Sequence, residues 1–253
     1  SHASMRDGIK ASDAKSFKFS HNDMNALEML LKKNHNKAKT IWVVIESIYS
    51  MDGDFAPLND IYELAERYNA VILADEAHAT GIYGEQGKGL CWDYIQKNGY
   101  DRLITLHTCG KAIGVAGGLV CASHEIIDYL INTARPFIYT TAPMPLQAYM
   151  VHKSLEILVS DDGDARRAKL LSLCVKGREL FGGAGTQIIP IIIGSDENAL
   201  NTAQALQNEG YDIRAIRPPT VPEGTARLRI SLSSALDVDT LHNIAKLLDK
   251  VND

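Results

Sequence analysis

Long apolar stretches and clusters of basic residues are both missing from this chain of 253 residues. No uninterrupted apolar run approaches the roughly 20 residues that a membrane-spanning helix needs, and we expect no signal peptide. Lysine and arginine together number 26 against 31 acidic residues, which gives a net charge of -5. Because basic residues never cluster, the chain carries no electrostatic footprint for nucleic acid. We therefore expect neither a membrane nor a nucleic-acid partner.

Cysteine is also scarce. The four cysteines are widely spaced and form no C-x-x-C pair. This spacing is not typical of a zinc site or of a disulfide framework, and unpaired thiols persist in a reducing compartment. We therefore expect free thiols, no metal and a cytoplasmic location. The residues are Cys91, Cys109, Cys121 and Cys174.

The first 160 residues alternate apolar strands with amphipathic helices, as a doubly wound α/β sheet does. Strands that are apolar throughout are typical of a parallel sheet with helices on both faces. Asn22 and Asp23 supply the N-cap of the second predicted helix. We expect strands at 40–46, 71–75, 103–108 and 118–122, a short edge strand at 16–19, and helices at 4–12, 26–33, 58–68, 125–134 and 146–159.

The last third of the chain changes character after an acidic break at 161–164, where we place a domain boundary. Its pattern predicts a small α+β domain with helices on one face of an antiparallel sheet. The predicted domains are thus a large one at 1–160, which we expect to be incomplete at its N-terminus, and a small one at 161–253. The small domain should hold a helix through 180, strands at 187–193, 213–216 and 226–231, and helices at 199–209 and 237–250.

Lys111 stands in a turn of small residues directly after the apolar strand at 103–108. Between Gly110 and Ala112 it has little access to bulk water, so we expect it to pair with an anion or to lose its charge. A desolvated lysine has a lowered pKa and becomes a nucleophile. The alternative is a lysine whose charged end reaches the surface, which is the commoner role for a single lysine.

An acid and a histidine follow the strand at 71–75. Asp75 ends this strand and His78 comes three residues later, at the edge where open α/β sheets bind ligands. A lysine, an acid and a histidine at that edge are the groups that pyridoxal 5'-phosphate (PLP) requires. Lys111 would hold the aldehyde, Asp75 the ring nitrogen in its protonated form, and His78 the phenolic oxygen.

Further candidates are hydroxyls and one histidine. Ser50 and Thr108 lie in loops after strands, and their hydroxyls suit the phenolic oxygen or the phosphate of PLP, although both are also ordinary turn residues. Thr140 and Thr141 follow a proline-bounded segment. His2 could stack on the cofactor ring, or it could simply belong to a frayed chain end.

Arg217 precedes a segment stiffened by three prolines, P-P-T-V-P. A rigid mount suits an arginine that binds a carboxylate through two hydrogen bonds. A surface arginine in a polyproline-like linker is an equally good interpretation of the residue alone. Arg227 and Arg229 alternate on one predicted strand, and we expect them to serve structure.

Four motifs occur in a characteristic order along the chain: E-S-I-Y-S-M-D-G-D at 46–54, D-E-A-H-A-T-G at 75–81, G-E-Q-G-K-G at 84–89 and T-C-G-K-A at 108–112. In this order they resemble the α-oxoamine synthase family, fold-type-I PLP enzymes that condense an amino acid with an acyl thioester. The segment 215–228 is most similar to the members that serve biotin synthesis. The resemblance extends over essentially the whole chain.

The resemblance implies a partial PLP-dependent transferase large domain with a mostly parallel sheet, a small C-terminal α+β domain, and a homodimer. It implies L-alanine and pimeloyl-CoA or pimeloyl-ACP as substrates and 8-amino-7-oxononanoate as product. Within this family, S-H-A-S at 1–4 makes His2 the ring-stacking histidine, and Lys111, His2 and Asp75 become catalytic. Ser50, His78, Thr108, Thr140 and Thr141 fall on cofactor-contacting positions, the two threonines toward a neighbouring subunit, and Arg217 on the position of the substrate carboxylate.

Two features depart from the family pattern. Cys109 stands where members usually carry phenylalanine or leucine, and the glycine-rich region before the S-H-A-S motif is absent. The alternatives are another α-oxoamine synthase, such as glycine C-acetyltransferase, 5-aminolevulinate synthase or serine palmitoyltransferase, and a non-catalytic binding subunit of the same fold. The joint presence of Lys111, Asp75 and His78 argues against the binding subunit.

Overall fold

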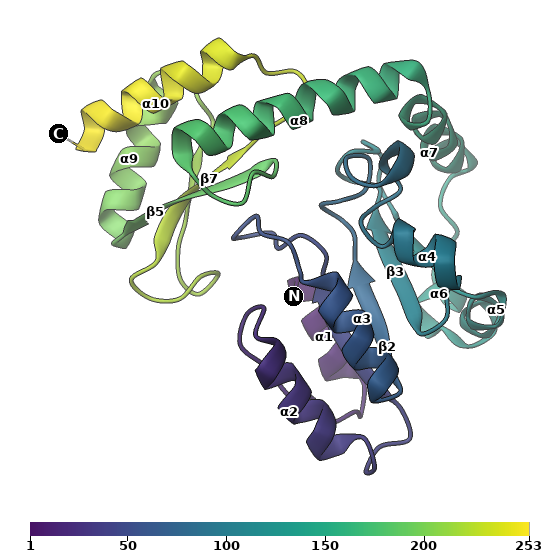
Figure 1. Cartoon of the computed structure of the whole chain (residues 1–253). Helices are drawn as coiled ribbons and strands as arrows, with labels where there is room; N and C mark the ends of the chain where they lie inside the picture. Colours follow the sequence, from purple (N-terminus) through teal and green to yellow (C-terminus); the bar gives the residue numbers. More distant parts are fainter. Residues whose placement is uncertain (253) are drawn as a thin grey trace. The chain divides into compact units, whose positions relative to one another are not determined.

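The computed structural model describes residues 1–252 and divides into two compact units (Figure 1). The first unit contains residues 1–48 and 55–163. The second contains the loop 49–54 and the chain from residue 164 onward. The sequence-based boundary was placed at 161–164, and that prediction did not assign the loop 49–54 to the C-terminal unit.

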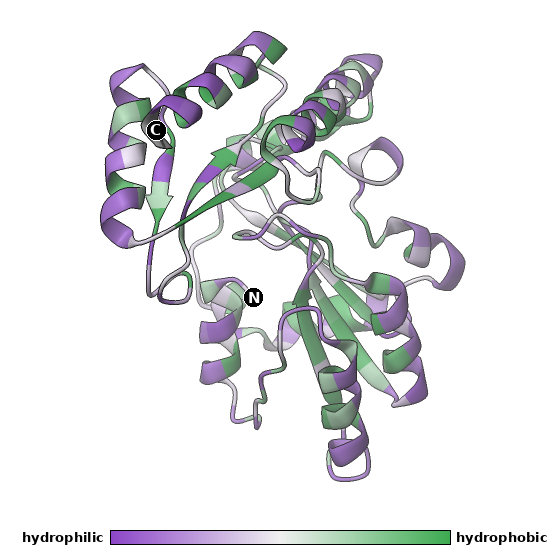
Figure 2. Ribbon diagram, turned by 60° about the vertical axis from the view of Figure 1, so that its left-hand side comes forward, coloured by the Kyte–Doolittle hydropathy of each residue, from purple (hydrophilic) through white to green (hydrophobic). Residues whose placement is uncertain are grey.

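A four-stranded sheet forms the first unit, in the order β1-β2-β3-β4. The first three strands run parallel, and β4 pairs antiparallel with β3 at one edge. The strands are largely hydrophobic (Figure 2), as strands covered by helices are. Their bounds are β1 Ile41–Glu46, β2 Ala70–Asp75, β3 Leu103–Thr108 and β4 Gly118–Cys121.

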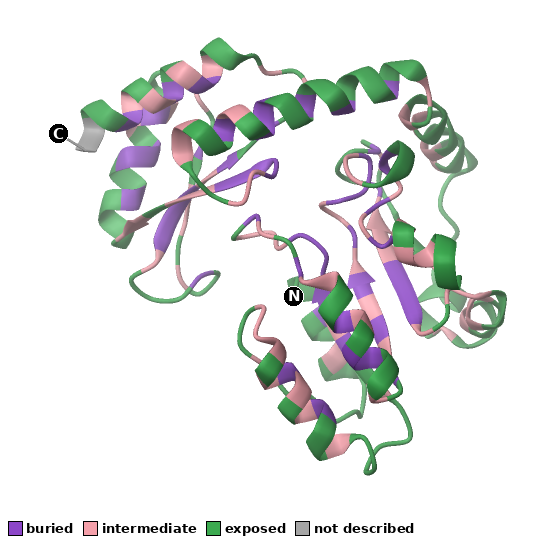
Figure 3. Ribbon diagram, in the orientation of Figure 1, coloured by how far each residue is buried: buried purple, intermediate pink, exposed green. Residues whose placement is uncertain are grey.

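The helices of the first unit begin and end close to the predicted positions. Asp23 caps the second helix, since its carboxylate accepts the Ala26 N–H at 2.9 Å, as the sequence predicted. Buried and exposed residues alternate along α2 and α3 (Figure 3), and α3 packs against β2. The bounds are α1 Ala3–Ala11, α2 Met24–Asn34, α3 Leu58–Arg67, the short 3-10 helix η1 Glu85–Gly87, α4 Trp92–Asn98, α5 His124–Thr133, α6 Arg135–Ile138 and α7 Pro145–Leu158.

The expected edge strand at 16–19 is wrong. These residues are irregular, and the side chain of Phe17 is 56% exposed. Alternation over four residues is a weak signal, because a strand also needs a neighbour that accepts its backbone hydrogen bonds. In residues 1–252 the segment pairs with no strand.

An antiparallel sheet of three strands, in the order β5-β7-β6, forms the second unit. Helix α8 begins at Asp161, so the acidic residues 161–164 form its first turn and are not a break between helices. Acidic residues are favourable there because they lie at the positive end of the helix dipole. Helix α9 packs on all three strands. The bounds are α8 Asp161–Phe181, β5 Ile188–Gly194, α9 Asp196–Asn208, β6 Arg214–Ile216, β7 Ala226–Ser231 and α10 Val238–Asn252.

Two arginines on β7 hold the loop 49–54 against the second sheet. Arg227 donates from Nη1 to Asp52 Oδ1 at 2.7 Å, and Arg229 donates from Nε to the Ser50 carbonyl at 2.7 Å. The intervening residue Leu228 is fully buried on the opposite face, as the period of two in a strand requires. The structural role expected for both arginines is confirmed.

The same loop approaches β5 so closely that it requires glycine. Gly53 has φ +67°, and a Cβ atom there would lie 2.1 Å from the Ile188 carbonyl oxygen. Gly224 has φ +73° but faces open space. Any L-residue at either position is therefore strained, but only at Gly53 does it also collide with backbone.

We predict that Gly224→Ala lowers the free energy of unfolding by about 1 to 2 kcal/mol, the usual cost of a left-handed alanine. Gly53→Ala should cost at least about twice as much, because the backbone of β5 must also move. Urea denaturation of both variants and the parent chain measures the difference. Equal losses would contradict the close approach of the loop to β5.

Candidate active site

The three parallel strands end at one edge of the first sheet. Glu46, the last residue of β1, is in register with Asp75, the last residue of β2, and Asp75 is in register with Leu106 near the end of β3. The loops that follow these strands therefore emerge side by side. Open α/β sheets bind ligands at this edge.

Asp75 is half-buried at the end of β2, where its Oδ1 accepts the Ala77 N–H at 2.9 Å. Burial raises the pKa of this carboxyl group, the Ala77 hydrogen bond opposes the rise, and the nearby Glu46 carboxylate adds to it. Electrostatic interactions with Lys111 and His2 lower the same pKa. The structure thus places two predicted residues, Lys111 and His2, within electrostatic reach of a third, Asp75.

Lys111 occupies a compact turn after β3. Cys109 donates its N–H to the Gly117 carbonyl and accepts the Val115 N–H, both at 2.9 Å, which closes the turn. Cys109 and Ile113 take the buried positions, at 1% and 3% exposure, whereas Lys111 is exposed. The expectation that Lys111 is shielded from water is therefore wrong for this chain, because its turn directs other residues inward.

The other candidates of the first unit lie around this edge or in exposed loops. His2 caps α1, with its Nδ1 3.3 Å from the Ser4 N–H, and His78 is half-buried in the turn after β2. Thr108 accepts the Gly110 N–H on its hydroxyl at 3.3 Å. Thr140 and Thr141 are exposed in the connection between α6 and α7.

Two predicted residues belong to the second unit. Ser50 is half-buried in the loop 49–54, and its carbonyl accepts the Arg229 guanidinium. Arg217 follows β6 and is exposed, and its carbonyl accepts the Thr220 N–H at 3.0 Å in a tight turn. In both segments a hydrogen bond to the residue's own carbonyl group holds the backbone in place. The roles of the two side chains in a site remain predictions.

Sequence reasoning missed Glu76, the residue after Asp75. It is fully buried, and its carboxylate accepts the Leu90 N–H at 2.7 Å and the Cys91 N–H at 3.2 Å. Burial raises the pKa of Glu76, and hydrogen bonds from Cys91, Leu90 and Ser47 oppose that rise. The available signal was an acid that continues the buried alternation of the preceding strand, followed by a loop rich in glycine.

His107 on β3 was missed as well. Its Nδ1 lies 2.8 Å from the Thr80 hydroxyl and its Nε2 lies 2.9 Å from the Thr105 hydroxyl. Thr80 gives its hydroxyl hydrogen to the Glu76 carbonyl at 2.7 Å, so His107 donates from Nδ1, and in the neutral ring Nε2 then accepts from Thr105. Burial lowers the pKa of His107, which favours this neutral tautomer.

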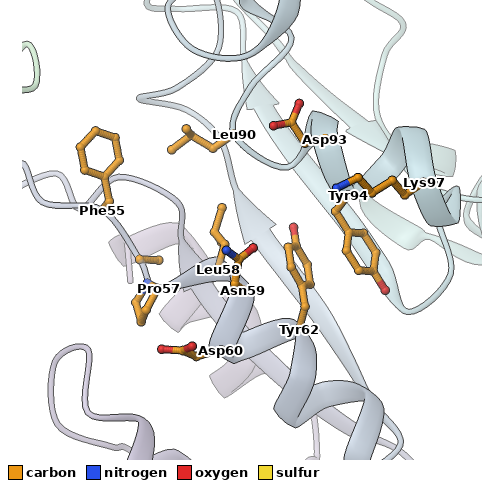
Figure 4. Close-up of a pocket in the computed structure, with 11 residues that line it drawn as sticks. Phe55, Pro57, Leu58, Asn59, Asp60, Tyr62, Leu90, Asp93, Tyr94 and Lys97 are labelled. Atoms are coloured by element: carbon orange, nitrogen blue, oxygen red, sulfur yellow. The ribbon is translucent and has the colours of Figure 1, made fainter.

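A surface pocket of about 550 Å³ lies between the start of α3 and helix α4 (Figure 4). Tyr62 and Tyr94 stack in its wall with ring centroids 3.9 Å apart. Leu90, whose N–H binds Glu76, lines the same pocket. None of the site residues predicted from the sequence is among its lining residues.

The aminotransferase class I and II family matches residues 1–248. The chain belongs to this family. It is 43% identical over 251 residues to an 8-amino-7-oxononanoate synthase of Herminiimonas arsenicoxydans, covering 95% of this chain and 64% of that protein. It is 42% identical over 261 residues to the enzyme of the same name from Cupriavidus metallidurans, covering 99% and 63%. The chain thus spans less than two thirds of the length of these relatives.

Solved structures show the same fold. Serine palmitoyltransferase from S. paucimobilis, which holds a PLP–myriocin aldimine, superposes with a TM-score of 0.89 at 26% identity and covers 100% of this chain and 64% of its own. An 8-amino-7-oxononanoate synthase from Francisella tularensis superposes with a TM-score of 0.82 at 26% identity, covering 98% and 72%. The expected fold, that of PLP-dependent transferases with a mostly parallel sheet and a small α+β part, is confirmed. Within residues 1–252, every helix is too short or too polar to cross a membrane.

The lowered pKa of His107 predicts a pH dependence of stability. Below its ordinary value of 6.5 the unfolded chain binds a proton that the folded chain does not, so the stability contributed by neutral His107 is present above that pH and is lost as the pH falls. Removing the group should flatten this decline by up to about 1.4 kcal/mol per pH unit.

Urea denaturation at pH 7.5 and 5.5 of His107→Gln and the parent measures the effect. His124→Gln is the control, because the ring of His124 is 84% exposed. A decline with falling pH that is equal in all three proteins would refute the neutral buried state of His107.

Proposed function

We propose that this chain belongs to a PLP-dependent enzyme that makes 8-amino-7-oxononanoate and that it carries the cofactor lysine. The reaction joins L-alanine to a pimeloyl thioester and releases carbon dioxide and the free thiol carrier, pimeloyl-CoA or pimeloyl-ACP being the donor. The observation that carries the proposal is the half-buried Asp75 within electrostatic reach of Lys111 at the ends of parallel strands. The 8-amino-7-oxononanoate synthases at 42–43% identity support the substrate assignment.

The residues at this edge fit PLP chemically. Asp75 uses Oδ1 for the Ala77 N–H, and a carboxylate with two oxygens has acceptor capacity left for a pyridinium N–H. A ring cation there would also offset the cost of burying the Asp75 charge. Because Lys111 is exposed, its amine is accessible to an aldehyde.

When bound, PLP supplies an electron sink for the carbanion formed at the α-carbon of the amino acid. Lys111 holds the cofactor and then removes the α-proton with its Nζ. Asp75 keeps the ring nitrogen protonated, since its carboxylate stabilises the charged form. His2 stacks on the ring and His78 binds the phenolic oxygen.

The remaining assignments complete the site. Ser50 and Thr108 offer hydroxyls to the cofactor, and Arg217 binds the carboxylate of L-alanine through a two-pronged hydrogen bond. Thr140 and Thr141, exposed after α6, reach the phosphate held by a second copy, which makes the enzyme a homodimer. The four cysteines are free thiols, and we place the protein in the cytoplasm.

The solved serine palmitoyltransferases favour a second candidate, a related condensation that starts from serine. Identity argues for alanine, because the chain is only 26–28% identical to these structures. We predict that the purified protein releases carbon dioxide from L-alanine with pimeloyl-CoA at least about tenfold faster than from glycine or L-serine. A preference for serine with a long-chain acyl thioester would replace the proposed substrates.

The attachment of the cofactor has its own test. Borohydride reduction should fix a pyridoxyl group covalently on the peptide that contains Lys111, as mass spectrometry would show. Lys111→Ala should abolish the label and the visible absorbance of the cofactor. Lys88→Ala, which removes a half-buried loop lysine paired with Glu85, is the matched control and should keep both. A label that survives Lys111→Ala would refute the assignment of this lysine.

A further inference from the structure

Glu76 lies on the side of the first sheet opposite to Asp75. In β2 the residues Ala70, Ile72 and Ala74 are buried, whereas Asp75 is half-buried, and side chains of a strand alternate between faces. Glu76 continues the buried series, at 0% exposure. Helix α3 packs against β2, and its Tyr62 lies close enough to Cys91 and Glu76 for both to raise the pKa of the tyrosine. Glu76 is therefore behind the proposed site and cannot touch a ligand beside Asp75.

The Glu76 carboxylate has several donors directed at it. Both oxygens accept backbone N–H groups, from Leu90 and from Cys91, and the side chains of Ser47 and Cys91 add hydrogen bonds that favour the charged form. Such a set of donors suits an ionised carboxylate, because each lone pair then has a partner. With a glutamine at this position, the side-chain NH2 group would face the backbone N–H of Leu90 or Cys91, and two donors cannot bond to each other.

The backbone around Glu76 is built to admit this carboxylate. Gly89 has φ +106°, and a Cβ atom there would lie 2.0 Å from Glu76 Oε2. The loop returns to the turn after β2, where Gly81 donates its N–H to Gly87 at 2.7 Å and Gly89 donates to Tyr83 at 2.8 Å. The carboxylate thus joins the end of β2 to a loop that folds back over it.

The same residue is fixed to the neighbouring strand. Glu76 donates its N–H to the Leu106 carbonyl at 2.8 Å, and its own carbonyl accepts the Thr80 hydroxyl at 2.7 Å. Thr80 in turn contacts His107 of β3. The turn 76–81, which carries His78, is consequently tied to β3 on one side and to the loop 84–91 on the other.

We propose that Glu76 is a positioning residue for the cofactor site: its buried carboxylate, held by the Leu90 and Cys91 amides, fixes the backbone that sets Asp75 and His78 against PLP. The proposal rests on the function proposed above. Small displacements of catalytic groups cost as much as about a hundredfold in rate, so a tie of this kind affects chemistry without touching the substrate.

Glu76→Gln tests the proposal, with Glu85→Gln as the matched control. Glu85 lies in the same loop, but it is exposed and binds Trp92 and Gln96 on the outer side. In Glu76→Gln, hydrogen exchange of the peptide 84–92 should accelerate at least about tenfold even without cofactor. The visible circular dichroism of bound PLP should shrink, and exchange of the alanine α-proton should slow by about ten- to a hundredfold. Glu85→Gln should match the parent in all three measurements.

The outcomes separate the two proposals. If the parent protein carries no PLP on Lys111, the proposed function is refuted and this inference with it. If the parent carries PLP and Glu76→Gln merely melts at a lower temperature, with unchanged circular dichroism and α-proton exchange while folded, the role of Glu76 alone is refuted. Should Glu76→Gln not fold, Cys91→Ala removes only the thiol donor, and it should give the same changes in smaller measure; no change would overturn the proposal.

Discussion

The parallel pairing of β1, β2 and β3 is the constraint on which the candidate site depends. Because these strands run in one direction and end in register at Glu46, Asp75 and Leu106, the three loops that follow must leave the sheet at the same edge. An antiparallel arrangement would have sent alternate loops to opposite edges and separated the acid on β2 from the lysine after β3. The hydrogen bonds between the backbones of these strands therefore determine which residues, far apart in the sequence, can belong to the same site.

Much of this arrangement could be predicted from the sequence, for identifiable reasons. The strand that ends in Asp75 is apolar on both faces, so both the strand and its burial could be predicted. Asp23 is a typical N-cap residue, so the start of α2 could be predicted as well. The exposure of Lys111 was not readable, because composition places small and apolar residues around it but does not say which of them turn inward. In the folded turn those are Cys109 and Ile113. The prediction of a strand at 16–19 was wrong for a related reason. Alternation of polar and apolar residues indicates the two faces of a strand, but it does not show whether a neighbouring strand is there to accept its backbone hydrogen bonds.

The second unit shows a different limit of sequence reasoning. Residues 49–54 lie between two elements of the first sheet in the chain, but Arg227, Arg229 and Thr186 bind them to the second unit. No local pattern reveals such a connection, since the partners are about 130 to 180 residues apart in the chain. The glycine in M-D-G-D is typical of a turn, but only the approach of Ile188 explains why glycine is needed there. The loop also contains Ser50, so the position of one predicted cofactor contact depends on the arginines of β7.

The two adjacent acids at the end of β2 differ in the groups that stabilise their carboxylates, and this difference distinguishes a proposed ligand-binding carboxylate from a structural one. Burial raises the pKa of both groups. For Asp75 this rise is opposed by one backbone donor and by electrostatic interactions with Lys111 and His2, which leaves the carboxylate acceptor capacity for a cationic partner. Glu76 compensates with backbone and side-chain donors of the protein itself, so further partners have no room. Neighbouring residues of a strand point to opposite faces of the sheet. Two carboxyl groups one residue apart can therefore have different roles, one in the proposed site and the other in the structure behind it.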